Sequence, residues 1–196
     1  MVKPGTDHWI GVKRILRYLK GTLSYGLVFS HSQSDDFSLH GYSDADWAGD
    51  IDTRKSTSGY IFRLGPSTIS WRSNKQSIVA LSTTEAEYVA LCQAVQEAVW
   101  LRNLLSSLYF MQNGPTVIFE DNQSTISLSN SLCSISNSRL KHVEIKFHYV
   151  KDIIKRNIVK LQYCPTNEMI GDVFTKGLAR PAFKKFRKGM GVDIIQ

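Results

Sequence analysis

The sequence predicts an α/β protein built on a mixed β-sheet with helices packed on its faces. Three β-rich stretches come first, at 38–47, 59–65 and 67–75, and turn-prone residues separate them. The later segments alternate between helical periodicities and short apolar runs, which gives the order βββαβααβα. The 196 residues are 42% hydrophobic and 11% aromatic, enough apolar material for a packed core.

Residues 1–35 precede this pattern and are expected to form an appendage to a main domain spanning 37–190. Thr6 or Asp7 can cap a basic amphipathic helix that ends at Gly21. This helix could bind nucleic acid or simply pack against a neighbour. A short strand, YGLVFS, and a polar connector, HSQSDD, would follow it. The apolar stripe of the helix would consist of Trp9, Val12, Leu16 and Leu19.

The first strand of the main domain ends in a cluster of aspartates, in the stretch GYSDADWAGD. Alternation along a strand places Asp44 and Asp46 on one face and Ala45 and Trp47 on the other. This pattern does not distinguish Asp44 from Asp46, and a plain acidic turn is an equally good interpretation. Trp47 and Trp71 are expected in the core.

The longest predicted helix, about Thr84 to Leu108, carries a carboxylate at the start of its apolar face. Glu87 is in helical register with an apolar stripe, and a buried carboxylate is costly unless it is paired or holds a cation. Capping boxes at Ser82–Glu85 or Thr84–Glu87 are the alternative, but they leave the alignment of Glu87 with the stripe unexplained. The stripe continues through Leu91, Ala94, Ala98, Leu101, Leu105 and Leu108.

Two more aspartates follow apolar segments. Asp121 ends the run TVIFED, where a helical stretch starts at Asn122, and Glu120 points to the opposite face. Ligand sites form outside the carboxyl ends of such strands, although a helix N-cap explains Asp121 equally well. A helix from about Arg139 to Arg156 and the strand IVKLQYC come next. Asp172 then lies at the edge of the apolar stripe of a last helix that begins near Asn167, where an acidic residue is also ordinary.

The charge balance suggests what these carboxylates could do. The chain has a net charge of +7, which favours a polyanionic partner such as nucleic acid, although ordinary surface charge is the simpler interpretation. Carboxylate oxygens are the preferred ligands of Mg²⁺ and Mn²⁺. Two such ions about 4 Å apart can activate water and stabilise the leaving oxygen of a phosphodiester. Asp44, Glu87, Asp121 and Asp172 together therefore indicate a metal-dependent nuclease.

Other site classes find little support in the sequence. Cys92, Cys133 and Cys164 are scattered, which favours reduced thiols inside a cell over a disulfide framework or a zinc site. No apolar run of about 18 residues occurs and the start lacks a signal-peptide core, so neither a membrane span nor a leader is expected.

Five stretches of the sequence resemble the ribonuclease H region of a copia-type retrotransposon Pol polyprotein. Their order and spacing are specific, and they cover nearly everything from residue 37 to about 190. The opening stretch, HWIGVKRILRYLKGT, is similar to the end of the reverse transcriptase portion that precedes this region. The five stretches are GYSDADWAGDIDTRKSTSGYIF, ISWRSNKQSIVALSTTEAEYVAL, DNQSTISLSN, LKHVEIKFHYVKD and GDVFTKGL.

The resemblance implies a ribonuclease H-like fold with a five-stranded mixed sheet and helices on both faces. It also implies four catalytic carboxylates that together bind two Mg²⁺ or Mn²⁺ ions. They are Asp44 on the first strand, Glu87 on the first long helix, Asp121 after the fourth strand and Asp172 on the last helix. The implied reaction is hydrolysis of the RNA strand of an RNA–DNA hybrid during reverse transcription, leaving 3′-hydroxyl and 5′-phosphate ends. The polymerase domain of the same polyprotein would help to hold the hybrid, and no small-molecule substrate is expected.

One departure from the family concerns proton transfer. Cellular relatives carry a histidine in the loop before the last helix, whereas the loop CPTNEM has none. His142 and His148 lie in the preceding helical stretch, and a structural or solvent-facing role is the favoured interpretation for both. The candidates for phosphate contacts are Arg139, Lys141, Lys146, Lys151, Lys155, Lys184, Lys185, Arg187 and Lys188.

Two competing functions remain open. The chain could be a catalytically silent nucleic-acid-binding or interaction module derived from a retroelement. It could also be a strand transferase with DNA as its substrate, although Asp172 after the strand IVKLQYC favours the ribonuclease arrangement. The Asp35–Asp36 pair lacks the flanking apolar strands of a polymerase signature. An intracellular location is expected, in a cytoplasmic virus-like particle or the nucleus.

Overall fold

A computed structural model describes residues 4–29, 37–131 and 141–195, with side chains in the last range from residue 144 onward. Its central element is a five-stranded sheet in the order β4-β3-β2-β5-β6. Strand β2 is antiparallel to β3 and parallel to β5, and β5 is parallel to β6, so the predicted mixed sheet is confirmed. The strands are β2 (Leu39–Asp46), β3 (Thr57–Leu64), β4 (Ser67–Lys75), β5 (Thr116–Glu120) and β6 (Val159–Tyr163).

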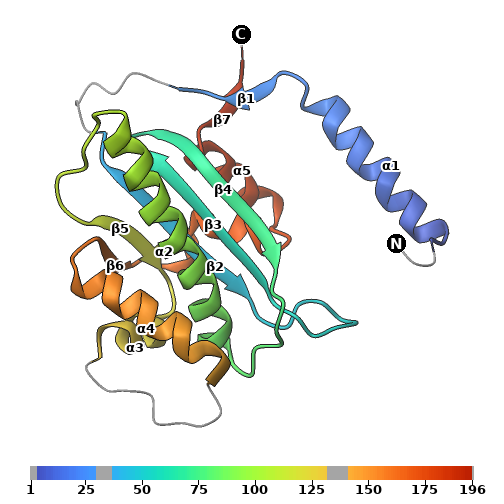
Figure 1. Cartoon of the computed structure of the whole chain (residues 1–196). Coiled ribbons are helices and arrows are strands. Elements are labelled where there is room, and N and C mark those ends of the chain that lie inside the picture. The colour runs from blue at the N-terminus through green and yellow to red at the C-terminus, as the bar shows by residue number, and fades with distance from the viewer. Residues whose placement is uncertain (1–3, 30–36, 132–140, 196) are drawn as a thin grey trace.

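Helices cover both faces of this sheet. Figure 1 shows α2 (Thr83–Ser107) and α4 (Lys141–Lys155) in front of the strands and α5 (Arg180–Gly189) behind them. Because side chains alternate along a strand, β3 contributes to both layers. Tyr60 and Phe62 join the larger core with α2 and α4, and Ile61 joins a smaller core with Phe186 of α5. The sheet is thus held between two apolar layers.

The long helix α2 agrees with its predicted bounds to within one residue at each end. Leu91, Ala94, Ala98, Leu101 and Leu105 are buried as the stripe predicts, but Leu108 is 65% exposed. The prediction for Leu108 is wrong because the helix ends at Ser107 and Leu108 is only its C-cap.

The predicted last helix near Asn167 is also wrong. Two short 3₁₀ helices, η2 (Thr166–Glu168) and η3 (Ile170–Phe174), occupy that segment, and α5 starts only at Arg180. Met169 interrupts the turns with extended backbone, at φ −73° and ψ 93°, and its side chain is fully buried. A proline in the first turn of α5, where no backbone N–H is needed, then marks the start of a regular helix.

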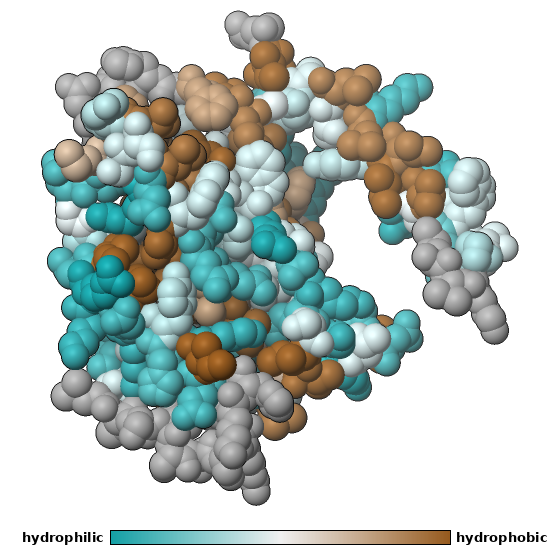
Figure 2. Space-filling view, in the orientation of Figure 1, coloured by the Kyte–Doolittle hydropathy of each residue, from teal (hydrophilic) through white to brown (hydrophobic). Residues whose placement is uncertain are grey.

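The N-terminal segment lies apart from the sheet. Helix α1 (Thr6–Gly21) projects away from the body of the molecule, and none of its residues is buried (Figure 1). Its N-cap is Gly5 rather than Thr6 or Asp7, because the ring Nδ1 of His8 accepts the Gly5 N–H at 3.0 Å. The apolar residues of α1 form an exposed brown band in Figure 2. They include Ile10, Ile15, Leu16 and Leu19, and Trp9 on the same helix is exposed as well.

A small two-stranded sheet connects this segment to the end of the chain. Strand β1 (Tyr25–Leu27) pairs antiparallel with β7 (Val192–Ile194). The remaining helix, α3 (Gln123–Asn130), follows β5, and the side chain of Asn122 caps it by accepting the Thr125 N–H at 3.0 Å. None of the described helices is both long and apolar enough to cross a membrane.

A glycine allows η3 to lie directly against the sheet. Gly59 of β3 is the register partner of Asp44 on β2. A Cβ at Gly59 would lie 2.7 Å from Cγ2 of Thr175 and 2.8 Å from Cβ of Phe174. Only glycine therefore fits beneath the end of η3 without a shift of this segment.

We expect Gly59→Ala to lower the free energy of unfolding by about 1–3 kcal/mol, because the added methyl group overpacks the η3 contact. Chemical denaturation measures this change. Gly177→Ala is the matched control, since a Cβ there meets nothing within 4 Å. Equal stability of the two variants would show that η3 does not constrain Gly59.

Candidate metal centre

Three of the predicted carboxylates converge at one edge of the sheet. Asp44 lies near the end of β2, Glu87 lies near the start of α2, and Asp121 directly follows β5. One carboxylate oxygen from each lies within 4.8 Å of the corresponding oxygens of the other two. Asp44 is 1% exposed and Glu87 is 7% exposed, whereas Asp121 is partly open to solvent. Because β2 and β5 are parallel, their carboxyl ends meet at this edge.

Asp172 joins this group from η3 without completing a single four-residue cluster. Its Oδ1 lies 2.9 Å from Nζ of Lys176, and the same Nζ lies 3.8 Å from Oδ2 of Asp44. The hydroxyl of Thr175 also donates to Oδ2 of Asp44. Asp172 is therefore linked to Asp44 through the two residues that follow η3.

A fifth carboxylate, which the sequence did not single out, is buried beside the group. Glu120 is completely buried; its Oε1 accepts the Asn122 N–H at 3.3 Å, and its Oε2 has no hydrogen-bond partner. Alternation placed Glu120 opposite Asp121, but it gave no sign that this opposite face packs beside Glu87. The sequence signal that could have suggested a buried carboxylate is the position of Glu120 on the same face as Ile118.

The electrostatics of the group favour neutralisation. Burial raises the pKa of Asp44 to about 6, with smaller increases from Asp172 and Asp121 and opposing effects of Thr175 and Lys176. Burial, followed by the charges of Glu120 and Asp44, raises the pKa of Glu87 well above its usual range. Burial also raises the pKa of Asp172 and of Glu120. Carboxylates that are this close repel one another unless a proton or a cation neutralises them.

The group fits a divalent cation. Oε2 of Glu87 is buried and has no hydrogen-bond partner among the described residues. The donors are all carboxylate oxygens, the ligands that Mg²⁺ and Mn²⁺ prefer. Asp44, Glu87 and Asp121 would hold such an ion, and Oδ2 of Asp121 is already oriented by the hydroxyl of Thr166 at 2.7 Å.

The neighbouring acidic residues have other roles. Asp50 accepts the N–H and hydroxyl of Thr53 at 2.7 and 2.6 Å and pairs with Lys75, so it organises the turn after β2. Glu85 accepts the Leu81 N–H at 2.7 Å while Ser82 caps α2. Capping thus accounts for Glu85 and leaves Glu87 for the cluster.

Several predicted nucleic-acid contacts are already used within the fold. Nζ of Lys185 donates to the Asn167 carbonyl at 2.6 Å. Arg187 pairs with Asp193 at 3.5 Å and stacks over the Tyr25 ring, and Nζ of Lys151 lies over the Phe147 ring. Lys184, Lys188 and Lys155 are exposed, and Lys146 is partly exposed.

The structure gives little support to His142 or His148 as a residue for proton transfer. His148 is largely exposed, and its Nε2 lies 3.9 Å from Glu144 on the same helix. The side chains of His142 and Lys141 lie outside the described part of the chain, as do Arg139, Cys133, the connector at 31–36 and its Asp35–Asp36 pair. Cys92 and Cys164 are free, buried thiols.

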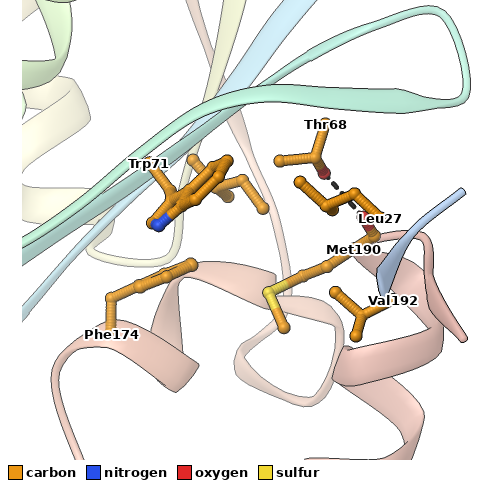
Figure 3. A pocket seen from close by; sticks show the side chains of 7 residues that line it. Leu27, Thr68, Trp71, Phe174, Met190 and Val192 are labelled. Carbon is orange, nitrogen blue, oxygen red and sulfur yellow. Dashed lines mark hydrogen bonds between the residues drawn. The ribbon is translucent and has the colours of Figure 1, made fainter. Parts of the chain in front are cut away.

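The two tryptophans expected in the core are half-exposed, so that prediction is wrong. The indole N–H of Trp47 donates to the Ala80 carbonyl at 3.1 Å, which anchors the ring at the molecular surface. Trp71 lines an apolar cavity of about 230 Å³ between β4, η3 and the β1–β7 sheet (Figure 3). The cavity contains no carboxylate and is separate from the acidic group. Its other lining residues are Leu27, Ile61, Thr68, Phe174, Met190 and Val192.

Comparisons with known sequences identify relatives over nearly the whole chain. The chain is 41% identical over 189 residues to the retrovirus-related Pol polyprotein from transposon TNT 1-94 of Nicotiana tabacum, and 39% identical over 194 residues to that from transposon RE2 of Arabidopsis thaliana. These matches cover 96% and 98% of this chain but only 14% and 13% of the relatives. Half of the chain is 57% identical to the secreted RxLR effector protein 161 of Plasmopara viticola, covering 68% of that protein. No family model matches.

Comparisons with solved structures identify the fold. LC11-RNase H1 matches with a TM-score of 0.53 at 15% identity, over 76% of this chain and 97% of that one. The complex of LC11-RNase H1 with an RNA/DNA hybrid matches with a TM-score of 0.50 at 14% identity, over 70% of this chain and 94% of that one. The five-stranded sheet with its flanking helices is therefore the ribonuclease H fold.

The raised pKa of Asp44 predicts how pH affects the metal-free protein. An unfolded carboxyl loses its proton near 3.8, whereas folded Asp44 keeps its proton to about 6. The folded state therefore binds more protons in this window, and its stability falls as pH rises through it. Between about pH 4.5 and about pH 7.5, the free energy of unfolding of the wild type should fall by about 1–3 kcal/mol more than that of Asp44→Asn.

Urea denaturation in chelator at both pH values measures this difference. Asp52→Asn is the control, because Asp52 is exposed in the turn after β2 and should follow the wild type. An Asp44→Asn variant with the same pH dependence as the wild type would contradict the destabilising burial of Asp44.

Proposed function

This chain is a homologue of one segment of the retrovirus-related Pol polyproteins of copia-type transposons and has a ribonuclease H fold, and we propose that it is a divalent-metal-dependent nuclease that hydrolyses the RNA strand of RNA–DNA hybrids. The observation that carries the proposal is the convergence of Asp44, Glu87 and Asp121 at the carboxyl edge of two parallel strands. The unpartnered oxygen of Glu87 supports a bound cation there.

The side chains have different roles in the proposed reaction. Two Mg²⁺ or Mn²⁺ ions would be held by four carboxylates: Asp44, Glu87, Asp121 and Asp172, the last of which lies on η3. When bound, these ions would lower the pKa of a water and stabilise the charge on the leaving oxygen. Thr175 and Thr166 fix the rotamers of Asp44 and Asp121 through the hydrogen bonds described above. None of the described histidine side chains lies at the site, and the side chain of His142 lies outside the described residues.

The proposed substrate follows from the same comparison. LC11-RNase H1, whose fold this chain shares, has been solved with an RNA/DNA hybrid. Among the basic residues predicted from the sequence to contact phosphates, Lys146, Lys155, Lys184 and Lys188 are described and have no structural contact assigned above, and we propose that they contact phosphates. Selectivity for the RNA strand would rest on contacts to the 2′-hydroxyl groups.

The relatives also suggest a place for the chain in a larger protein. We propose that 37–190 is the nuclease unit and that 1–35 is the end of the reverse transcriptase portion. The exposed apolar band of α1 supports this division, because none of the residues of α1 is buried within the described chain. In such a polyprotein the polymerase domain would share the hybrid with the nuclease, in a virus-like particle or the nucleus.

Purified chain should cleave the RNA strand of a labelled hybrid when Mg²⁺ or Mn²⁺ is present. Asp44→Asn and Asp121→Asn should each reduce the rate by at least about 10²-fold, because each removes a charge that neutralises the bound cation. Asp52→Asn serves as the control and should cleave at the wild-type rate. Persistent cleavage by both substituted proteins, or equal cleavage in chelator, would overturn the proposal.

The second candidate is a catalytically silent interaction module. The match of half the chain to a protein named as a secreted effector favours it, since that name implies no nuclease. The cleavage assay separates the two functions. Tight hybrid binding without cleavage at any Mg²⁺ or Mn²⁺ concentration would favour the silent module.

Hybrid affinity should fall as salt concentration rises, because phosphate contacts release counterions. Replacing Lys184 and Lys188 together by Gln should make the slope of log affinity against log salt shallower by about 1–2. Filter binding in chelator measures both slopes. Lys160→Gln, an exposed substitution on β6, is the control. A wild-type affinity that does not depend on salt would exclude phosphate-dominated binding.

A further inference from the structure

Lys176 lies inside the acidic group, where a soluble cation would otherwise be expected. Its Nζ is 2.9 Å from Oδ1 of Asp172 and 3.8 Å from Oδ2 of Asp44. These two carboxylates are almost fully buried, whereas the lysine side chain is 38% exposed. No sequence pattern singled out Lys176, which lies four positions after Asp172.

The acidic group is neutralised unequally, because the positive charge of Lys176 lies on only one side of it. Neither Glu87 nor Asp121 forms an ion pair with a Lys or Arg among the described residues, whereas Asp44 faces Lys176 on the side of Asp172. Between Asp44 and Asp172 the ammonium of Lys176 already supplies a positive charge. Burial opposes this charge, but the two aspartates outweigh it and raise the pKa of Lys176.

We propose that Lys176 is a positioning residue that acts as a built-in counterion: its ammonium holds Asp44 and Asp172 together in the metal-free protein, and a second divalent ion must displace it. The inference rests on the proposed metal-dependent function. It predicts unequal metal sites, with a first ion held by Asp44, Glu87 and Asp121 and a weaker second ion that competes with Lys176.

Displacement is physically feasible because of how Lys176 is attached. Two cations held by the same carboxylate oxygens repel each other strongly at distances of a few ångströms. The lysine stem is flexible and strongly hydrated at its end, so the ammonium can move into solvent. Asp44 keeps a hydrogen bond from Thr175 when the ammonium leaves. Thr175 therefore preserves the orientation of Asp44 in both states.

Calorimetric titration of the full chain with Mn²⁺ alone tests this proposal. The wild type should bind one ion more tightly than the second. In Lys176→Gln the second affinity should rise about 10-fold, because the competing charge is gone, while the first should change much less. Lys176→Arg keeps a positive charge and should retain weak second binding. Lys160→Gln should match the wild type, and the effect of Lys176→Gln should vanish in an Asp172→Asn background.

Thermal unfolding without metal supplies an independent readout. Lys176→Gln should have a lower melting temperature in chelator than the wild type, Lys176→Arg should recover part of the loss, and Mn²⁺ should stabilise Lys176→Gln more than the wild type. An unchanged or weakened second Mn²⁺ affinity in Lys176→Gln would overturn the counterion role and leave the nuclease proposal standing. A wild type that binds no Mn²⁺ would overturn both.

Discussion

Mutual repulsion among buried carboxylates is the constraint around which this molecule is arranged. Asp44 comes from a strand, Glu87 from a helix and Asp121 from the residue after another strand, yet one carboxylate oxygen from each lies within 4.8 Å of those of the other two. Such a group is unfavourable without a neutralising charge, so the surrounding structure must hold it in place. The two apolar cores on opposite faces of the sheet do this, since one anchors α2 and the other anchors η3 and α5.

The contacts around the group show how function and stability are balanced. Thr166 and Thr175 each orient one carboxylate by donating a hydroxyl, and Lys176 offsets part of the charge on the Asp172 side. Glu120 acts in the opposite sense, because its buried carboxylate adds to the potential that raises the pKa of Glu87. Negative potential of this kind lowers the stability of the metal-free fold and increases its affinity for cations.

The sequence was informative wherever a periodic pattern determined a position. The helical stripe placed Glu87 on a buried face, and the apolar run before Asp121 placed that residue at the end of a strand. Family resemblance, rather than pattern, distinguished Asp44 from Asp46. Patterns failed where tertiary packing decides the outcome: η3 replaces a helix because Met169 is buried in extended conformation, and Trp71 is exposed beside a cavity. No pattern could show that Lys176 and Glu120 lie beside the other carboxylates, because that depends on which segments pack together.

Anomalous X-ray scattering from crystals grown with Mn²⁺ is the most direct test of the claim that these carboxylates form a cation site. An anomalous peak surrounded by oxygens of Asp44, Glu87 and Asp121, absent from crystals of Asp121→Asn, is the predicted result. Mn²⁺ bound only elsewhere on the chain, or a closed acidic group with no anomalous peak at saturating Mn²⁺, would contradict the claim.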